Sequence, residues 1–294
     1  MKKIFYTFIY FTFIIIIIFL LANYLYLTED IAIIIFISAF FMYLLFIIVT
    51  ILKNKTIKRS KIKHRKRYLL LILPIIIIFA IFFSKSNENV EIPESLIAFA
   101  EKYPETSDFV RDYPKNYNKH HNINVKNEVT KGIIPLFIQW DERWGYESYG
   151  NNFLAVNGCG PTCLSMVFCG LTGDTSLNPL EMAKFSESQG YYISGQGTSW
   201  ALMTDGAEML GLNAKNGKVS KEYILKNLTK STPMICSMYP GDFTYTGHFI
   251  VLTDIDSEGK IVVNDSNSIK NSNKHWDIEE ILPQIRNIWI YSIL

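Results

Sequence analysis

The sequence predicts a chain of two parts, in which N-terminal transmembrane helices precede an external α+β domain. Three long apolar runs, at residues 4–27, 31–52 and 68–83, dominate the first part. The second part extends from about residue 132 to residue 294 and has helical patterns first and strand patterns later. Helices that precede an antiparallel set of strands are typical of an α+β domain, and this stretch is long enough to bury one core.

The three apolar runs set the expected membrane anchor. The first two are long enough to cross a bilayer, and the third is near the lower limit, so a buried core helix is the alternative for residues 68–83. The first run has no small-residue cleavage site and a second span follows at once, which argues against a cleavable signal peptide. We therefore expect residues 1–84 to form a three-helix anchor.

The charge distribution predicts how this anchor is oriented. Residues 53–67 are crowded with Lys and Arg, whereas the turn between the first two runs holds only Glu29 and Asp30. The positive-inside rule then puts the N-terminus and the basic loop in the cytoplasm, and three spans deliver everything after residue 83 to the outer face of a bacterial cytoplasmic membrane. The lipid bilayer is therefore an expected partner. A basic loop between two spans does not indicate nucleic-acid binding, and no nucleotide-binding motif is present.

Residues 85–131 are polar and are expected to form a linker with short helices. Pro93 opens a pattern that predicts a helix to Lys102, and a second short helix is expected over residues 105–112. Residues 116–131 are rich in Asn and Lys with little to bury, which is typical of a flexible tether.

The external α+β domain is expected over residues 132–294. Helix caps at Asn178, at Thr198 or Ser199, and at Ser220 predict helices that end near Gly190, Gly211 and Lys230. A further short helix is expected after Asp277. Apolar patterns predict strands at residues 234–239, 246–255, 260–265 and 288–294.

Cys159 is the most informative residue of this domain. It lies between Gly158 and Gly160, where the backbone can turn sharply, and Pro161 suits the first turn of a helix. An apolar, helix-compatible run follows, and Gly170 is expected to end it. A cysteine at a helix N-terminus is favoured as thiolate, which is the nucleophilic form. The local pattern fits a small buried cysteine as well as a reactive one.

A candidate base lies downstream, at the start of a predicted hairpin. His248 follows Gly247 and begins an apolar strand, residues 256–259 are turn-forming, and the returning strand ends at Asp265. Folding the hairpin about its turn brings Asp265 within about two positions of His248, a diagonal that long side chains can span. Nucleophile, base and orienting carboxylate form the general arrangement of a Cys-His-Asp site.

The other cysteines indicate neither disulfides nor zinc. Cys159, Cys163 and Cys169 crowd a single predicted helix, and Cys236 lies in a predicted strand. Cys163 and Cys169 are expected in the core. No Cys-x-x-Cys pattern or neighbouring His completes a zinc site, and the acidic turn at residues 254–258 lacks the calcium-loop pattern. We expect no metal and no other cofactor.

These residues together resemble the cysteine peptidases related to the bacteriocin-processing, double-glycine-leader family, and most closely the stand-alone, membrane-anchored branch of the C39-like peptidases. The resemblance covers about residues 133–265 and includes the stretches 134–144 and 195–200. It implies a papain-like fold and a catalytic triad of Cys159, His248 and Asp265. It also implies a peptide or protein substrate.

The oxyanion hole departs from the usual papain-like pattern. Phe153 stands six residues before Cys159, where many such enzymes carry Gln, and the nearest amides are Asn151, Asn152 and Asn157. The resemblance suggests Gln139 instead, reached through a loop, while a polar residue on an edge strand is the alternative. The Cys159 N–H is a second candidate donor. Trp200 is a candidate for the substrate cleft or for the core.

Three functions fit the sequence. The first is a membrane-anchored cysteine peptidase that cuts peptide bonds at the outer face of the membrane. The second is a peptidoglycan amidase or endopeptidase, although wall hydrolases of the NlpC type usually carry Asp-Cys-Ser-Gly rather than Gly-Cys-Gly-Pro. The third is an inactive peptide-binding or immunity protein with the same fold, against which the intact Cys, His and Asp argue.

Overall fold

The computed structural model describes residues 90–119 and 121–293, which form one unit by their contacts. The predicted membrane anchor at residues 1–84, with its basic loop at 53–67, lies outside the described residues. Within residues 90–119 and 121–293, no helix is both long and apolar enough to span a bilayer.

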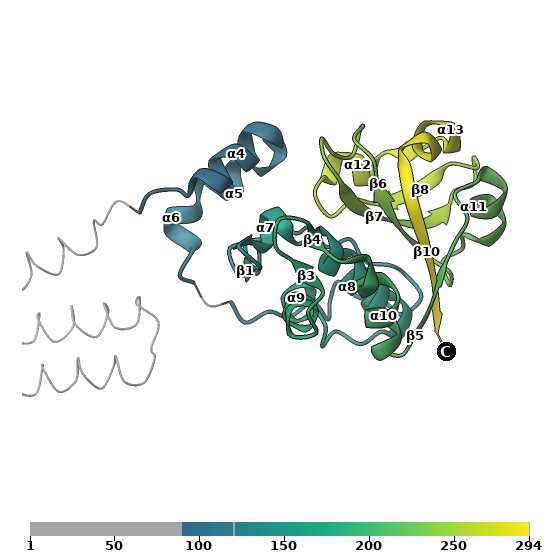
Figure 1. Cartoon of the computed structure of the whole chain (residues 1–294), viewed down its shortest axis with the longest axis horizontal. Coiled ribbons are helices and arrows are strands. Elements are labelled where there is room, and N and C mark those ends of the chain that lie inside the picture. Colours follow the sequence, from purple (N-terminus) through teal and green to yellow (C-terminus); the bar gives the residue numbers. More distant parts are fainter. Residues whose placement is uncertain (1–89, 120, 294) are drawn as a thin grey trace, which may run out of the picture. The chain divides into compact units, whose positions relative to one another are not determined.

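A six-stranded antiparallel sheet forms the C-terminal half of this unit (Figure 1). The strand order is β5-β10-β6-β7-β8-β9, so the last strand of the chain lies between β5 and β6. The strands are β5 (Leu212–Asn216), β6 (Met234–Met238), β7 (His248–Ile255), β8 (Ile261–Asn264), β9 (His275–Trp276) and β10 (Ile285–Ile293). The central place of β7 buries both of its faces over the first six residues, beginning at His248.

Helices precede the sheet, and α8 and α10 among them pack directly against it (Figure 1). They are α7 (Leu154–Asn157), α8 (Cys159–Thr172), α9 (Pro179–Ser188), the 3₁₀ helix η3 (Trp200–Met203) and α10 (Asp205–Met209). Two short hairpins lie among them: β1 (Ser148–Tyr149) with β2 (Asn152–Phe153), and β3 (Tyr192–Ile193) with β4 (Gly197–Thr198). The expected α+β arrangement is therefore present.

The sheet separates two hydrophobic cores. The first contains α8 and α9 with the inward side chains of β5, β7 and β10, among them Phe249, Val251 and Trp289. The second contains Ile250 and Leu252, which alternate along β7 with the residues of the first core. They pack with side chains of helices that follow β5 in the sequence. Those helices are α11 (Lys221–Asn227), α13 (Ile278–Ile281) and η4 (Leu282–Gln284), while α12 (Ile269–Asn273) has no buried residue. Alternation along a strand thus serves both faces.

The helix that begins at Cys159 ends at a different glycine from the expected one. Gly173 adopts a left-handed conformation (φ 78°) and caps α8, whereas Gly170 lies inside the helix and is buried. A Cβ at position 170 would stand 2.6 Å from Ile134 Cδ1, so this glycine serves close packing of the chain rather than helix termination. The prediction that Gly170 ends the helix was wrong because a glycine can be required for space alone.

Other elements differ from expectation at their ends. The helix expected up to Gly211 is split at Thr204 into η3 and α10, and Ser199 caps the first piece through the Ala201 N–H. Strand β10 begins at Ile285, earlier than expected, and β5 was not predicted at all. The caps at Asn178 and Ser220 are confirmed by hydrogen bonds to backbone N–H groups of α9 and α11.

The segment before the sheet domain is folded against it. It holds α4 (Glu94–Lys102), η2 (Pro104–Thr106), α5 (Ser107–Arg111) and α6 (Tyr113–Asn116). Helix α4 matches the first expected short helix, η2 and α5 together match the second, and α6 was not expected. The apolar side chains of the segment form a third buried cluster that includes Tyr146 and Ala155 of the domain. The rings of Phe109 and Tyr146 stack at 4.1 Å. The polar composition of residues 85–131 did not predict this packing.

Candidate active site

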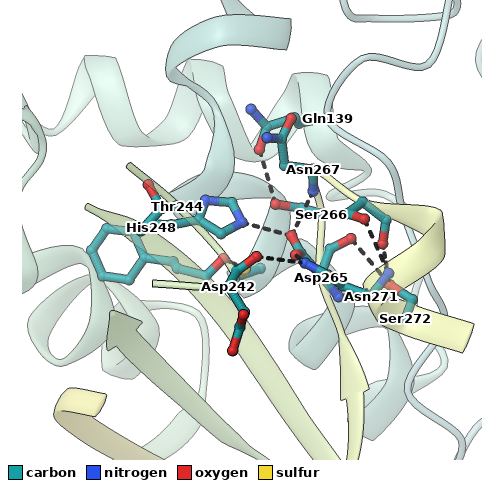
Figure 2. A network of polar contacts seen from close by, with 12 residues as sticks. Gln139, Asp242, Thr244, His248, Asp265, Ser266, Asn267, Asn271 and Ser272 are labelled. Carbon is teal, nitrogen blue, oxygen red and sulfur yellow. Dashed lines mark hydrogen bonds and ion pairs between the residues drawn. The ribbon is translucent and has the colours of Figure 1, made fainter. Parts of the chain in front are cut away.

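The structure brings His248 and Asp265 into direct contact. His248 Nε2 lies 2.7 Å from Asp265 Oδ1, and both side chains are buried (Figure 2). A carboxylate only accepts, so Nε2 is the donor and Nδ1 is left for another partner. His248 is the first residue of β7, and Asp265 follows the last residue of β8, so the expected hairpin creates this pair.

A set of hydrogen bonds holds the Asp265 carboxylate in place (Figure 2). Asn267 N donates to Oδ1 at 2.9 Å, and Asn271 Nδ2 donates to Oδ2 at 2.9 Å. Ser272 Oγ accepts from the Asp265 N–H at 2.9 Å. With His248, the carboxylate accepts three hydrogen bonds although it is fully buried. A buried charge requires such partners, and they also fix its orientation.

The pKa of His248 is raised from its ordinary value to about 10. Burial alone would lower this pKa, because it disfavours the charged ring. The negative charge and hydrogen bond of Asp265, followed by those of Cys159, more than offset the burial. The site therefore favours the protonated imidazolium form of His248.

Cys159 is the first residue of α8 and is partly exposed. Its charge raises the pKa of His248, and it adds to burial in raising the pKa of Tyr149 to about 12. Cys159 thus lies among these side chains, at the positive end of a buried helix. The flanking glycines are required for space: a Cβ on Gly160 would lie 2.7 Å from Thr198 of β4, and a Cβ on Gly158 would lie 2.5 Å from the Leu154 carbonyl oxygen.

The other three cysteines are buried and unpaired. Cys163 Sγ donates to the Phe249 carbonyl at 3.2 Å, and burial holds the pKa of its thiol well above the ordinary value. Burial also raises the pKa of Cys169 to about 12 and that of Cys236 still further. The expected core position of Cys163 and Cys169 is confirmed, and Cys159 is the accessible thiol.

Gln139 lies beside the His248–Asp265 pair rather than on an edge strand. Its Nε2 donates to the Ala155 carbonyl at 2.7 Å, and its Oε1 accepts from Ser266 Oγ at 2.9 Å (Figure 2). Its backbone N–H donates to the Ser266 carbonyl at 2.8 Å. The side chain therefore joins the residue after Asp265 to α7, the helix that immediately precedes Gly158 and Cys159. The second N–H of its amide is a possible donor toward the Cys159 side.

The alternative amides near Cys159 serve the hairpins instead. Asn151 Oδ1 accepts from the Tyr192 hydroxyl at 2.5 Å, and Asn157 Nδ2 donates to the Tyr149 carbonyl at 3.2 Å. Asn152 Oδ1 accepts from the Phe153 N–H.

Trp200 is 40% exposed and is not a core residue. Its ring meets the buried ring of Trp289 edge-on at 5.3 Å, and Arg286 lies 5.1 Å from its centre. Trp289 in turn contacts Phe249, the neighbour of His248 in β7. The core alternative for Trp200 is therefore wrong, and its place in a substrate cleft stays a prediction.

Several residues of the site had no individual signal in the sequence. Asn271 and Ser272 lie in an Asn- and Ser-rich stretch that follows Asp265, and this local enrichment could have identified them as carboxylate partners. Tyr103 and Glu105 belong to the preceding segment, yet they border the same loops. No pattern in the sequence links them to the site. Across residues 90–119 and 121–293, no three His, Cys, Asp or Glu side chains are grouped as a metal site would require.

Two of three comparisons with known proteins give matches, and the third gives none. The model of the Peptidase_C39 like family matches residues 131–292. Among solved structures, the fold is similar to the crystal structure of a double-glycine motif protease from an AMS/PCAT transporter in complex with the leader peptide. That similarity has a TM-score of 0.39 and 19% sequence identity, and it covers 56% of this chain and 94% of the other. A search of curated proteins found no match.

Proposed function

The chain belongs to the Peptidase C39-like family and is a cysteine peptidase, and from this premise we propose that Cys159, His248 and Asp265 hydrolyse peptide bonds at the outer face of a membrane. The observation that carries the proposal is the buried His248–Asp265 contact with Cys159 at the start of α8. These are the three positions that the family resemblance implies for nucleophile, base and orienting group.

The proposed reaction begins with proton transfer from the Cys159 thiol to His248 Nδ1. The thiolate attacks the peptide carbonyl carbon, and the carbonyl oxygen becomes an oxyanion. His248 then gives its proton to the leaving amine as the C–N bond breaks, which leaves an acyl-enzyme thioester. Water activated by His248 hydrolyses the thioester, and the thiol is restored. Asp265 stabilises the imidazolium and keeps Nδ1 directed away from itself.

Gln139 and the Cys159 N–H are the proposed oxyanion donors. The first N–H groups of a helix have no intrahelical acceptor, so the Cys159 amide is available for a ligand. One N–H of the Gln139 amide is taken by Ala155, which fixes the orientation of the other. Fixed donors are worth more than mobile ones, because they need no reorganisation when the oxyanion forms.

The membrane location is proposed on sequence alone. It rests on the apolar runs at residues 4–27, 31–52 and 68–83 and on the basic loop at residues 53–67. With the domain outside, its substrate is a peptide or protein at the outer face, and not a leader peptide in the cytoplasm. A reporter fused after residue 90 should be external and one inserted within residues 53–67 cytoplasmic. A cytoplasmic reporter after residue 90 would remove the third span and make leader-peptide cleavage the better proposal.

Activity is tested with the full chain in detergent, with Cys159→Ser as the matched inactive variant. The two proteins are incubated with a peptide library and with purified cell walls. Cleavage of peptides by the wild type alone supports the proposal. Release of wall fragments without peptide cleavage would support an amidase or wall endopeptidase instead. If neither substrate is cut, and if peptides still bind, the chain is an inactive peptide-binding protein of this fold.

A further inference from the structure

The segment before the family-matched residues contacts the loop that carries Asp265. The Glu105 carboxylate accepts hydrogen bonds from Ser268 Oγ and, at 3.0 Å, from the Lys270 N–H. Ser268 lies three residues after Asp265, and its N–H donates to the Asp265 carbonyl. Glu105 therefore ties η2 to the loop that sets the position of the buried carboxylate.

The same segment contacts the loop that carries His248. The rings of Tyr103 and Tyr245 lie 5.9 Å apart, and Lys102 Nζ lies 5.5 Å from the centre of each ring. Tyr245 stands in the connection between β6 and β7, three residues before His248. An ammonium held over two aromatic rings is attracted to both of them. The end of α4 thus contacts the loop that immediately precedes His248, the proposed base.

A third contact reaches the element before Cys159. Leu96 and Phe99 of α4 belong to the buried cluster that contains Ala155 and Val156 of α7. Helix α7 ends at Asn157 and is followed at once by Gly158 and α8. One short segment therefore packs against each of the three chain stretches that lead to the proposed triad.

Tyr103 of this segment lies close enough to the reacting groups for their charges to act on its hydroxyl. Burial is the main cause that raises the pKa of its hydroxyl, and the charges of Cys159 and Asp265 raise it as well. Tyr103 and Glu105 also line a pocket of about 540 Å³ together with Thr244, Asn267 and Asn271. The segment therefore borders the same space as the loop before His248 and the loop after Asp265.

We propose that residues 90–117 hold the active site in its working arrangement through two residues, Tyr103 and Glu105, which are positioning residues for His248 and Asp265. This inference rests on the proposed function of the triad. A loop connection is mobile unless other elements hold it, and β7 and β8 fix only the strand ends. The segment spans both loops and sets the spacing between the imidazole and the carboxylate. The catalytic unit accordingly begins near residue 90, before the residues that the family model matches.

The test compares Glu105→Ala and Glu105→Gln with Glu101→Gln in the full chain. Glu101 is an exposed carboxylate of α4, so its variant controls for the loss of a charge on the same segment. We expect Glu105→Ala to lower kcat by about 10- to 100-fold with little change in KM, because small displacements of reacting groups cost this much. Glu105→Gln retains a carbonyl acceptor and should keep more activity. Glu101→Gln should match the wild type.

A second readout does not need turnover. The rate of Cys159 alkylation by iodoacetamide is measured against pH, and in Glu105→Ala the rise of this rate should move to higher pH as His248 and Asp265 lose their fixed spacing. Tyr103→Ala should have the same effect, with Tyr117→Ala as the control from the same segment. If Glu105→Ala does not fold, as judged by circular dichroism, the comparison of Glu105→Gln with Glu101→Gln decides.

Two results would overturn the inference. Unchanged kcat and an unchanged alkylation profile in folded Glu105→Ala and Tyr103→Ala would make the segment a passive support. A higher kcat/KM in these variants would make it an inhibitory strap. Failure of the proposed function is distinct from both, because it would appear as equal activity of the wild type and Cys159→Ser.

Discussion

His248 Nε2 and Asp265 Oδ1 lie 2.7 Å apart in a region closed to solvent, and this contact joins the start of one strand to the end of the next. The carboxylate is itself held by Asn267 and Asn271, so the imidazole meets an acceptor that cannot rotate away. A ring held in this way keeps its other nitrogen directed at one place. This relationship underlies the first two predictions.

Cys159 should react with iodoacetamide rapidly at near-neutral pH and before the other three cysteines. The others are buried, and Cys159 has both access and a nearby imidazolium that favours thiolate. Mass spectrometry of the alkylated chain identifies the site. His248→Ala should slow the reaction at neutral pH and abolish turnover, and Asp265→Asn should keep the fold but lower kcat, by about 10²- to 10⁴-fold. Equal reactivity of Cys159 and a free thiol, with or without His248, would refute the catalytic proposal.

Stability should fall with rising pH because of His248. The pKa of His248 in the folded chain is raised to about 10. Its contribution to stability is therefore complete at a pH below the pKa of the unfolded chain, and it is lost as the pH rises through the pKa of the folded chain. At a pH between these two pKa values, His248 carries a proton in the folded state but not in the unfolded state. The free energy of unfolding should therefore drop by on the order of 1 kcal/mol per pH unit. The measurement is made in a Cys159→Ser variant, which removes the influence of the thiol on His248. In this variant Asp265 still raises the pKa of His248.

The measurement is urea unfolding of Cys159→Ser and of Cys159→Ser/His248→Gln at several pH values from about 7 to 9, inside the window given by linkage. The single variant should lose stability across this range, and the double variant should lack this component. If the free energies of unfolding of the two variants change in parallel with pH, His248 is neutral in the folded protein.

Gln139→Ala should lower kcat by about 10²- to 10³-fold, the usual cost of one oxyanion donor. Alkylation of Cys159 should be nearly unchanged, because an alkyl halide forms no oxyanion. The variant also loses buried hydrogen bonds to Ala155 and Ser266, so a loss of stability of about 1–3 kcal/mol is expected. Asn151→Ala is the control, since this exposed amide bonds Tyr192 in the hairpin region. A normal kcat in folded Gln139→Ala would assign the residue a structural role only.

Gly160→Ala should destabilise the fold near the nucleophile. The new methyl would stand 2.7 Å from Cβ, Cγ2 and Oγ1 of Thr198, and overpacking of this kind costs about 1–3 kcal/mol. The gain in helix propensity, about 1 kcal/mol, opposes this loss without removing the clash. Thermal unfolding should show a lower Tm that Thr198→Gly restores in the double variant. Gly247→Ala is the matched control, because a Cβ there meets no atom within 4 Å. Equal Tm values for both alanine variants would disprove the close contact.

Cys163→Ala should cost on the order of 1 kcal/mol and leave most of the activity. The thiol is fully buried and donates to the Phe249 carbonyl, so its loss leaves a small cavity and removes this hydrogen bond. Chemical denaturation and peptide turnover of the same preparation measure the two effects. Inactivity in a variant that is folded would give Cys163 a role that its burial does not suggest.

Local patterns were sufficient for the elements that carry the candidate triad. Glycines around Cys159 and turn residues at 256–259 act over a few neighbours, and so the start of α8 and the hairpin β7–β8 could be predicted within a few residues. The contact between His248 and Asp265 followed from the hairpin itself. Their catalytic roles, and those of Gln139 and Trp200, remain predictions.

Long-range packing was not predictable from the same patterns. Strand β5 is short and mostly polar, and only its pairing with β10 makes it a strand. Leu96, Phe99 and Phe109 belong to short apolar runs within a polar stretch, and Tyr146 and Ala155, far along the chain, complete the cluster that buries them. A single sequence does not indicate which distant surfaces come into contact. The composition of residues 90–117 therefore predicts a linker, although the segment packs against the domain.

All four cysteine thiols of the chain are unpaired, and three of them are enclosed by the cores. Reducing agents have no cross-link to break, so they can restore the Cys159 thiol without loosening the fold. Mild oxidants reach the same single sulfur first, since sulfenic acid forms on accessible thiolates. The redox state of the surroundings would therefore determine whether the enzyme works while leaving its architecture intact.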